Sequence, residues 1–290
     1  MKIEAKGTTN LLELLVDNYP NTSKNKIRKM LTEGRVTLNG EVEHKAKKSI
    51  QKSDIITILD KSVSKENTPA PIKKQTNLKI IFEDDSILVV DKPAGLLSVA
   101  TNRLEADTLH SRCVDYVKST DDKNWCYIVH RLDRETSGVM VLAHDKNSKE
   151  YLQNQFAQRE VYRTYHALVE GRLSKKNGTE NQWLVEDKNL HVKKVKPSFK
   201  GSKEAITHWE VIGDNEDNSL IRIQIETGRR HQIRMAMKSL GAPVVGDALH
   251  NAETDIYGRI CLHASSLEFL HPSSDEPVRF ESKIPFKTSL

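Results

Sequence analysis

The polar segment His130-Arg131-Leu132-Asp133-Arg134-Glu135-Thr136-Ser137-Gly138 holds the residues best suited to chemistry in this 290-residue sequence. Within it, Asp133 lies between Arg131 and Arg134. Nearby cations lower the pKa of a carboxyl group and keep it ionised. An ionised aspartate can act as a nucleophile or as a base. The same pattern also fits a surface aspartate in ordinary ion pairs, followed by a turn.

Other common catalytic signatures are absent from the sequence. It contains no glycine-rich nucleotide-binding loop, no HExxH zinc motif and no GxSxG nucleophile motif. The 11 histidines show no metal-ligand spacing, and the three cysteines (Cys113, Cys126 and Cys261) form no CxxC pair. We therefore expect no metal site and no disulfide framework, and nucleotide hydrolysis, hydride transfer and zinc hydrolysis lose support.

The elements that must position Asp133 are two flanking apolar runs, at 127–129 and 139–143, which predict a strand, a loop and a strand. Further apolar or alternating runs predict strands at 78–82, 87–90, 161–169, 206–212, 220–226 and 267–270. Helices are predicted at 146–158 and 230–240, and a loop or short hairpin over 171–203. The expected fold is α+β, with a large mixed or mainly antiparallel sheet flanked by helices.

Positive charge is concentrated at the start of the chain. Residues 1–77 carry a net charge of +6 and residues 78–290 a net charge of −1, against +5 for the whole sequence. Such asymmetry indicates a module that binds nucleic acid or another acidic surface. A solvated surface fits the charge equally well.

The first 60 residues predict a small folded module. Helices are indicated around 11–16 and over 24–33, followed by a strand at 36–38, the hairpin signal Asn39-Gly40 and a strand at 54–59. This order resembles the S-four RNA-binding domain over residues 8–60, although Ser53 stands where that domain usually has glycine. The resemblance implies binding of RNA phosphates by the basic residues of the second helix, Lys24, Lys26, Arg28 and Lys29. The polar, proline-containing residues 61–77 are expected to form a linker.

Four further segments accompany the polar loop in a fixed order. They are ILVVDKPAGL at 87–96, VYRTYHALVEG at 161–171, TGRRHQIR at 227–234, and GAPVVGD at 241–247 with LHA at 262–264. Together with 130–138 they resemble the RluA-type pseudouridine synthases, which isomerise uridine to pseudouridine in RNA. The resemblance spans about residues 78–285 and implies that residues 78–290 form a catalytic domain of the pseudouridine synthase fold.

The resemblance implies a role for five residues. Asp133 would be the catalytic aspartate, Tyr165 would stack on the target base, and Arg234 would pair with Asp133. Arg131 would help displace the flipped nucleotide, and Ile233 falls at the apolar pocket position. This agrees with the chemistry, because a uridine in folded RNA must be flipped out to expose its reacting atoms.

Several local interpretations stay open at this stage. Arg230, Arg234 and Lys238 share one helical stripe, which a solvated surface would also explain. Arg163 stands where the family usually has lysine. Lys92 fits a turn residue better than a phosphate contact, and His130 is expected to orient the loop.

The predicted function is isomerisation of uridines in large-subunit ribosomal RNA, with tRNA as a second candidate substrate. A noncatalytic RNA-binding or ribosome-assembly protein is the alternative, and hydrolysis of the glycosidic bond by Asp133 with Glu135 is a third. The apolar runs are too short for a membrane span, and the first residues lack an apolar signal core. We therefore expect a cytoplasmic monomer that does not bind membranes.

Overall fold

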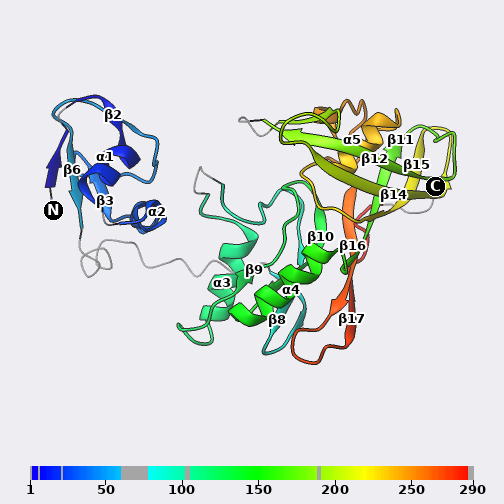
Figure 1. The fold of residues 1–290 in the computed structure, drawn as a ribbon, viewed down its shortest axis with the longest axis horizontal. Coiled ribbons are helices and arrows are strands. Elements are labelled where there is room, and N and C mark those ends of the chain that lie inside the picture. Colours follow the sequence, from blue (N-terminus) through cyan, green and yellow to red (C-terminus); the bar gives the residue numbers. More distant parts are fainter. Residues whose placement is uncertain are drawn as a thin grey trace. The chain divides into compact units, whose positions relative to one another are not determined.

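The computed structural model describes residues 2–5, 7–20, 22–59, 78–101, 105–187 and 191–286, without the side chains of residues 24, 25, 29 and 32. The chain forms two compact units, Met1–Gln75 with Ala100–Ala106 and Thr76–Val99 with Asp107–Leu290. We call them the N-terminal unit and the C-terminal unit and describe each by itself (Figure 1). The predicted linker, 61–77, lies outside the described residues.

The N-terminal unit has the predicted order of helix, helix, hairpin and strand. Its helices are α1 (Leu11–Asn18) and α2 (Lys24–Thr32). A four-stranded antiparallel sheet has the order β1-β6-β3-β4: β1 (Lys2–Glu4), β6 (Ile55–Ile58), β3 (Val36–Leu38) and β4 (Glu41–Val42). A separate pair joins β2 (Thr9–Asn10) to β5 (Ser49–Ile50). β1 lies before residue 8, where the predicted module begins.

Local sequence explains the turns of this unit. Asn10 caps α1, because its side-chain oxygen accepts the backbone N–H of Glu13 at 2.9 Å. Asn39 (φ 52°) and Gly40 (φ 93°) are both left-handed, as a two-residue hairpin requires. Ser53 adopts φ 74°, the conformation that glycine tolerates best, so the departure from the resembled domain leaves the turn in place.

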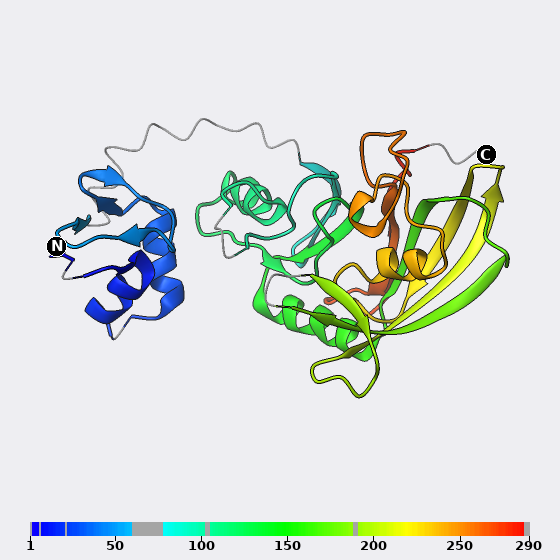
Figure 2. The ribbon, with the colours of Figure 1, turned by 90° about the horizontal axis from the view of Figure 1, so that it is seen from above.

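The C-terminal unit is built on an 11-stranded sheet, which confirms the predicted mixed and mainly antiparallel arrangement (Figures 1 and 2). Nine strands follow the order β13-β12-β14-β15-β11-β16-β10-β8-β7, while β17 pairs with β16 and β9 with β10. Their bounds are β7 (Lys79–Glu83), β8 (Ile87–Lys92), β9 (Tyr127–Ile128), β10 (Ser137–Ala143), β11 (Tyr162–Glu170), β12 (Asn177–Glu186), β13 (Val192–Val195), β14 (Lys203–Asp214), β15 (Asn218–Ile225), β16 (Leu262–Leu270) and β17 (Pro277–Glu281). Among the strand pairs in the described residues, β10 with β16 is the only parallel pair.

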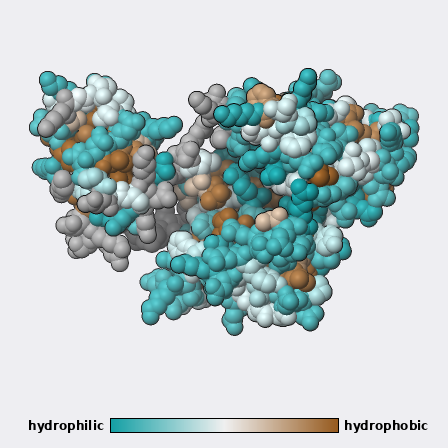
Figure 3. All heavy atoms as spheres, in the orientation of Figure 1, coloured by the Kyte–Doolittle hydropathy of each residue, from teal (hydrophilic) through white to brown (hydrophobic). Residues whose placement is uncertain are grey.

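Helices cover both faces at the centre of the sheet. Successive residues of β8 and β10 alternate between two buried clusters, so that Leu88 and Met140 enter one cluster and Val89 and Val141 the other. The helices are α3 (Leu109–Lys118), α4 (Lys146–Gln158), α5 (Gln232–Ser239) and the short 3-10 helix η2 (Ala248–His250). Side chains of α3 and α5 belong to the first cluster, and Leu152 of α4 belongs to the second. On the face shown in Figure 3, the surface of the C-terminal unit is mostly hydrophilic.

Two features differ from the sequence analysis. The stretch 171–203 forms the predicted hairpin, between β12 and β13, but the ten-residue β12 also pairs with β14 from Asn177 to Leu184, so the hairpin belongs to the main sheet. Of its residues only Gln182 and Leu184 are buried, and this is why no apolar alternation marked the strand. Helix α3 was also not predicted.

Among the described residues, no helix combines the length and the apolar character that a membrane crossing demands.

Candidate active site

The five residues to which the resemblance assigns a role in residues 78–290 line one pocket of the C-terminal unit, with a volume of about 460 Å³. Arg131 and Asp133 come from the loop between β9 and β10, Tyr165 from β11, and Ile233 and Arg234 from α5. They are far apart in the sequence, and the order of the strands brings them together.

The loop that carries Asp133 is fixed by Lys92, the last residue of β8. The Lys92 side chain is fully buried, and its Nζ donates to the backbone oxygens of Pro93 (2.9 Å), Leu96 (2.6 Å) and Arg134 (2.9 Å). Burial lowers its pKa from 10.5 to about 7. Lys92 is therefore neither a phosphate contact nor only a turn residue, since it joins the turn after β8 to the loop.

A glycine sets the close contact at the end of the loop. Gly138 has φ 120°, and a Cβ at this position would lie 2.1 Å from the backbone oxygen of Ala264. Gly138 and Ala264 are partners in the parallel pairing of β10 and β16. Glycine is required here because the two backbones approach too closely for any side chain.

His130 orients the start of the loop, as expected. Its Nε2 accepts the backbone N–H of Val141 at 3.2 Å, and its ring stacks on Phe156 with a centroid distance of 4.7 Å. Burial lowers the pKa of His130 to about 3, so the ring is neutral at pH 7. The proton then resides on Nδ1, because Nε2 is used as an acceptor.

Asp133 lies in the pocket wall with a side chain that is 22% exposed. Burial raises the pKa of Asp133 above its ordinary value. The guanidinium groups of Arg234, Arg230 and Arg131, and the backbone N–H of His231, oppose this rise. The predicted lowering of the pKa by neighbouring cations is thus present, but loss of solvent outweighs it, so the net shift of the pKa is upward.

The main partner of Arg234 is Asp247, which the sequence analysis did not identify. Arg234 Nε donates to Asp247 Oδ2 at 2.6 Å and Nη2 donates to Oδ1 at 2.7 Å, while Nη1 lies 3.9 Å from Asp133 Oδ2. Both side chains of the bidentate pair are buried. Arg234 is thus not part of a solvated stripe, and its contact with Asp133 is a second, longer one. Asp247 could have been identified as this partner, because it ends the motif at 241–247 and a buried arginine needs a carboxylate.

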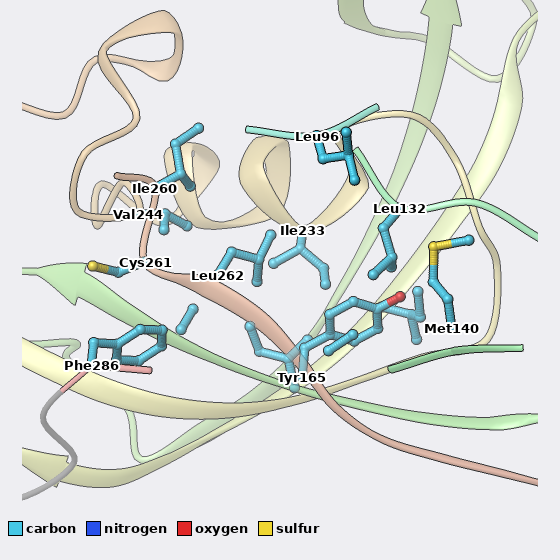
Figure 4. Close-up of a cluster of buried hydrophobic side chains, with 14 of the residues drawn as sticks. Leu96, Leu132, Met140, Tyr165, Ile233, Val244, Ile260, Cys261, Leu262 and Phe286 are labelled. Carbon is cyan, nitrogen blue, oxygen red and sulfur yellow. The ribbon is translucent and has the colours of Figure 1, made fainter. Parts of the chain in front are cut away.

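Tyr165 and Ile233 form an apolar wall of the pocket. Tyr165 is 7% exposed and Ile233 is 4% exposed. Figure 4 shows the Tyr165 ring, Ile233 and Leu132 pointing toward one another. Burial raises the pKa of Tyr165, so the phenol is neutral at pH 7. The pocket therefore presents a flat apolar surface beside one carboxylate and several guanidinium groups.

Arg163 and Arg131 occupy different places around the pocket. Arg163 is buried, donates to the backbone oxygens of Ile225 (3.3 Å) and Glu226 (2.7 Å), and lies over the Phe156 ring. It is therefore a structural residue of the wall, whereas Arg131 is exposed at the pocket.

The remaining predicted residues belong to α2 of the N-terminal unit. Lys26 is exposed and Arg28 is half-buried, while the side chains of Lys24 and Lys29 lie outside the description. Within the described part of the chain, no group of three or more His, Cys, Asp or Glu side chains is arranged to hold a metal ion.

Comparisons with known proteins identify the family of the chain. A family model described as RNA pseudouridylate synthase matches residues 86–239, a range that contains Asp133, Tyr165 and Arg234. An uncharacterized RNA pseudouridine synthase of Mycoplasma genitalium is 33% identical over 97% of this chain and 91% of its own length. The ribosomal large subunit pseudouridine synthase D of Neisseria meningitidis is 32% identical over 94% of this chain and 75% of its own.

The fold agrees as well. The structure of human RNA pseudouridylate synthase domain containing 4 superposes with a TM-score of 0.59 at 24% identity, covering 71% of this chain and 88% of that one. Together with the family match over more than half of the sequence, these likenesses lead to one conclusion: the chain belongs to the RNA pseudouridylate synthase family and is an isomerase of that family.

Proposed function

We propose that this enzyme converts uridine to pseudouridine in large-subunit ribosomal RNA, with Asp133 as its catalytic residue. The observation that supports this most directly is the pocket itself. It combines a half-buried carboxylate with a flat aromatic and aliphatic wall and with guanidinium groups at the carboxylate. Those are the features that a flipped nucleotide requires.

The reaction moves a base without loss of any group. The bond between C1′ and N1 of the uridine breaks, the freed uracil rotates, and a bond between C1′ and C5 forms. The proton displaced from C5 leaves, and N1 gains one. Asp133 either attacks C1′ or takes a sugar proton to give a glycal, and no step needs a cofactor.

The other pocket residues bind and orient. Tyr165 stacks on the flipped base, a contact worth about 1–3 kcal/mol. Ile233 closes the same wall, and water is kept from the base by both side chains. Arg234, held by Asp247, keeps Asp133 ionised in surroundings that favour the neutral acid. Arg131, exposed at the pocket, helps to displace the nucleotide from the RNA.

Ribosomal RNA is the proposed substrate because relatives similar over most of the chain are named for the large ribosomal subunit. We assign the chain to the RluA type and the N-terminal unit to the S-four RNA-binding domains. In this assignment Lys24, Lys26, Arg28 and Lys29 contact RNA phosphates. The three cysteines are free and buried, as suits a protein of the reducing cytoplasm.

The decisive experiment replaces Asp133 by asparagine. Unmodified large-subunit ribosomal RNA is incubated with wild type and with Asp133→Asn, and pseudouridine is mapped by chemical probing. The variant should form none while it still binds the RNA, because the amide can neither attack C1′ nor take a proton. Pseudouridine formation at the wild-type rate would overturn the assignment.

The role of the N-terminal unit has its own test. Replacing Lys24, Lys26, Arg28 and Lys29 by glutamine should weaken RNA binding and reduce its salt dependence. For a duplex region, the slope of log K against log salt falls by about 0.9 for each lost phosphate contact. The rate of pseudouridine formation at saturating RNA should stay unchanged. An unaltered salt slope would show that α2 does not bind the RNA.

A further inference from the structure

The segment from β13 to the start of β14 carries a concentration of positive charge that the reaction does not use. Residues 191–203 contain five lysines and no Asp or Glu: Lys193, Lys194, Lys196, Lys200 and Lys203. All five are exposed. Lys193 lies 3.6 Å from Asp187, whereas the other four have no acidic side chain within ion-pair distance among the described residues. Residues 78–290 carry a net charge of −1, so without these five lysines their net charge would be −6, and this segment is locally basic in a slightly acidic unit.

This segment also presents an aromatic ring to solvent. Phe199 is 53% exposed. Its position is defined by an ordered turn, because its N–H donates to the Lys196 oxygen at 3.0 Å and its own oxygen accepts from Ser202 N at 3.0 Å. Ser202 Oγ adds a bond to the Pro197 oxygen at 2.8 Å. We call residues 196–202 the basic turn, which Figure 2 shows as a yellow-green loop that extends beyond the neighbouring strands.

The base of this segment is attached to the active-site helix. Met235 of α5 packs with Leu184 of β12 and Ala205 of β14. Arg229, which lines the pocket, donates its Nε to the backbone oxygen of Glu204 at 2.9 Å, two residues after the basic turn. The basic turn is therefore connected through Glu204 and Arg229 to the wall of the pocket.

A second exposed aromatic ring in the same unit lies in the opposite electrostatic setting. Trp125 is 41% exposed and Lys118 Nζ lies 5.4 Å from its ring centroid, but the hollow beside it is net acidic, because it is lined by Glu83, Asp84, Asp85 and Asp145 against Lys123 and Lys146. Those carboxylates repel RNA phosphates, whereas the lysines around Phe199 attract them. An exposed aromatic ring alone thus does not indicate a base-stacking site. An exposed ring together with unpaired cations does.

We propose that the basic turn binds an unpaired stretch of the RNA substrate, with one base stacked on Phe199 and the adjacent phosphates held by Lys196 and Lys200. The inference rests on the proposed function for the identity of the substrate, but it concerns a surface outside the catalytic pocket. Aromatic stacking suits any base, so the turn contributes affinity and register and leaves the choice of uridine to the pocket.

The test compares four variants of the full chain: Phe199→Ala, Phe199→Tyr, Lys196→Gln with Lys200→Gln, and Trp125→Ala as the matched control. Binding of a fluorescein-labelled oligouridine is titrated at several salt concentrations, and circular dichroism checks the fold. We expect Phe199→Ala to weaken binding about 5- to 100-fold, without a change in the salt slope, because a neutral contact is lost. Phe199→Tyr should retain wild-type affinity.

The charge variant should behave differently, with a salt slope smaller by about 1.4 for two lost contacts to a single strand. Trp125→Ala should bind like wild type. The proposal is refuted if Phe199→Ala binds within twofold of wild type or if Trp125→Ala loses as much. Binding of vesicles containing phosphatidylserine that depends on Phe199 and the lysines, with unaltered RNA affinity, would instead identify a membrane contact. Because oligouridine binding is measured without turnover, failure of the proposed isomerase activity would be seen separately.

Discussion

Replacing Asp247 by asparagine tests how the active site holds its arginine. In the wild type the guanidinium of Arg234 is fixed by two short hydrogen bonds to Asp247 and lies 3.9 Å from Asp133. The Asp247 side chain is fully buried and that of Arg234 is 6% exposed. The substitution preserves the size of the side chain and removes its charge, so the effect reports the ion pair.

The expected loss of stability follows from that burial. Removing one partner of a buried ion pair costs about 3–5 kcal/mol, because the remaining charge is left without compensation. Asp133 stays close to Arg234 and offsets part of that charge, so we expect about 3 kcal/mol. In a domain of about 150–250 residues, each kcal/mol lowers Tm by about 2–4 °C, which predicts a fall of about 6–12 °C.

Catalysis should respond in two ways. With Asp247 neutral, Arg234 interacts more strongly with Asp133 and lowers the pKa of Asp133 relative to wild type. The acid limb of the kcat profile should therefore move to lower pH. At pH 7, kcat should fall about 10- to 100-fold, because Arg234 is no longer held in one orientation.

The assay combines thermal denaturation with single-turnover pseudouridine formation across the acidic pH range. Asp122→Asn, at an exposed position, is the control and should match wild type. An unchanged Tm and an unchanged acid limb in Asp247→Asn would show that Asp247 does not hold Arg234. A shift of the acid limb to higher pH would contradict the electrostatic reasoning.

Three further substitutions test the supports of the catalytic loop. Lys92 has a folded-state pKa of about 7, below its ordinary 10.5, so the unfolded chain binds more protons between these values and stability rises with pH there. Lys92→Met should lower the free energy of unfolding by at least about 3 kcal/mol. It should also abolish the rise of stability with pH, which urea titrations from about pH 7 to 10 would measure. Gly138→Ala should cost about 3–5 kcal/mol, since its Cβ would meet the Ala264 oxygen, whereas Gly95→Ala, also at positive φ but in open space, should cost about 1–2 kcal/mol. Asp133→Asn should be more stable than wild type at pH 7, because ionising a carboxyl with a raised pKa disfavours the folded state, and the difference should vanish as the pH falls toward 3.8 in melting experiments.

Part of the fold could be read from local patterns. Helix α4 was predicted with its observed bounds, and the hairpin at Asn39-Gly40 was predicted from two residues. Strand β12 was missed because it lies near the edge of the sheet and buries only two of its ten residues, so that no apolar alternation marks it. Such a strand is stabilised by backbone hydrogen bonds to β14, and these leave no mark in the residue types.

The polar loop, its single aspartate and the aromatic and arginine candidates were proposed from the sequence by itself, through motifs that resemble a known family, because residue types and their order need no fold to be seen. Tertiary structure alone decided which charges meet. Two carboxylates lie near the guanidinium of Arg234 in the folded chain, that of Asp247 at 2.6 Å and that of Asp133 at 3.9 Å. Burial of Asp133 likewise reversed the expected direction of its pKa shift. Desolvation and Coulomb attraction depend on distance and solvent exposure, and both quantities exist only once the chain has folded.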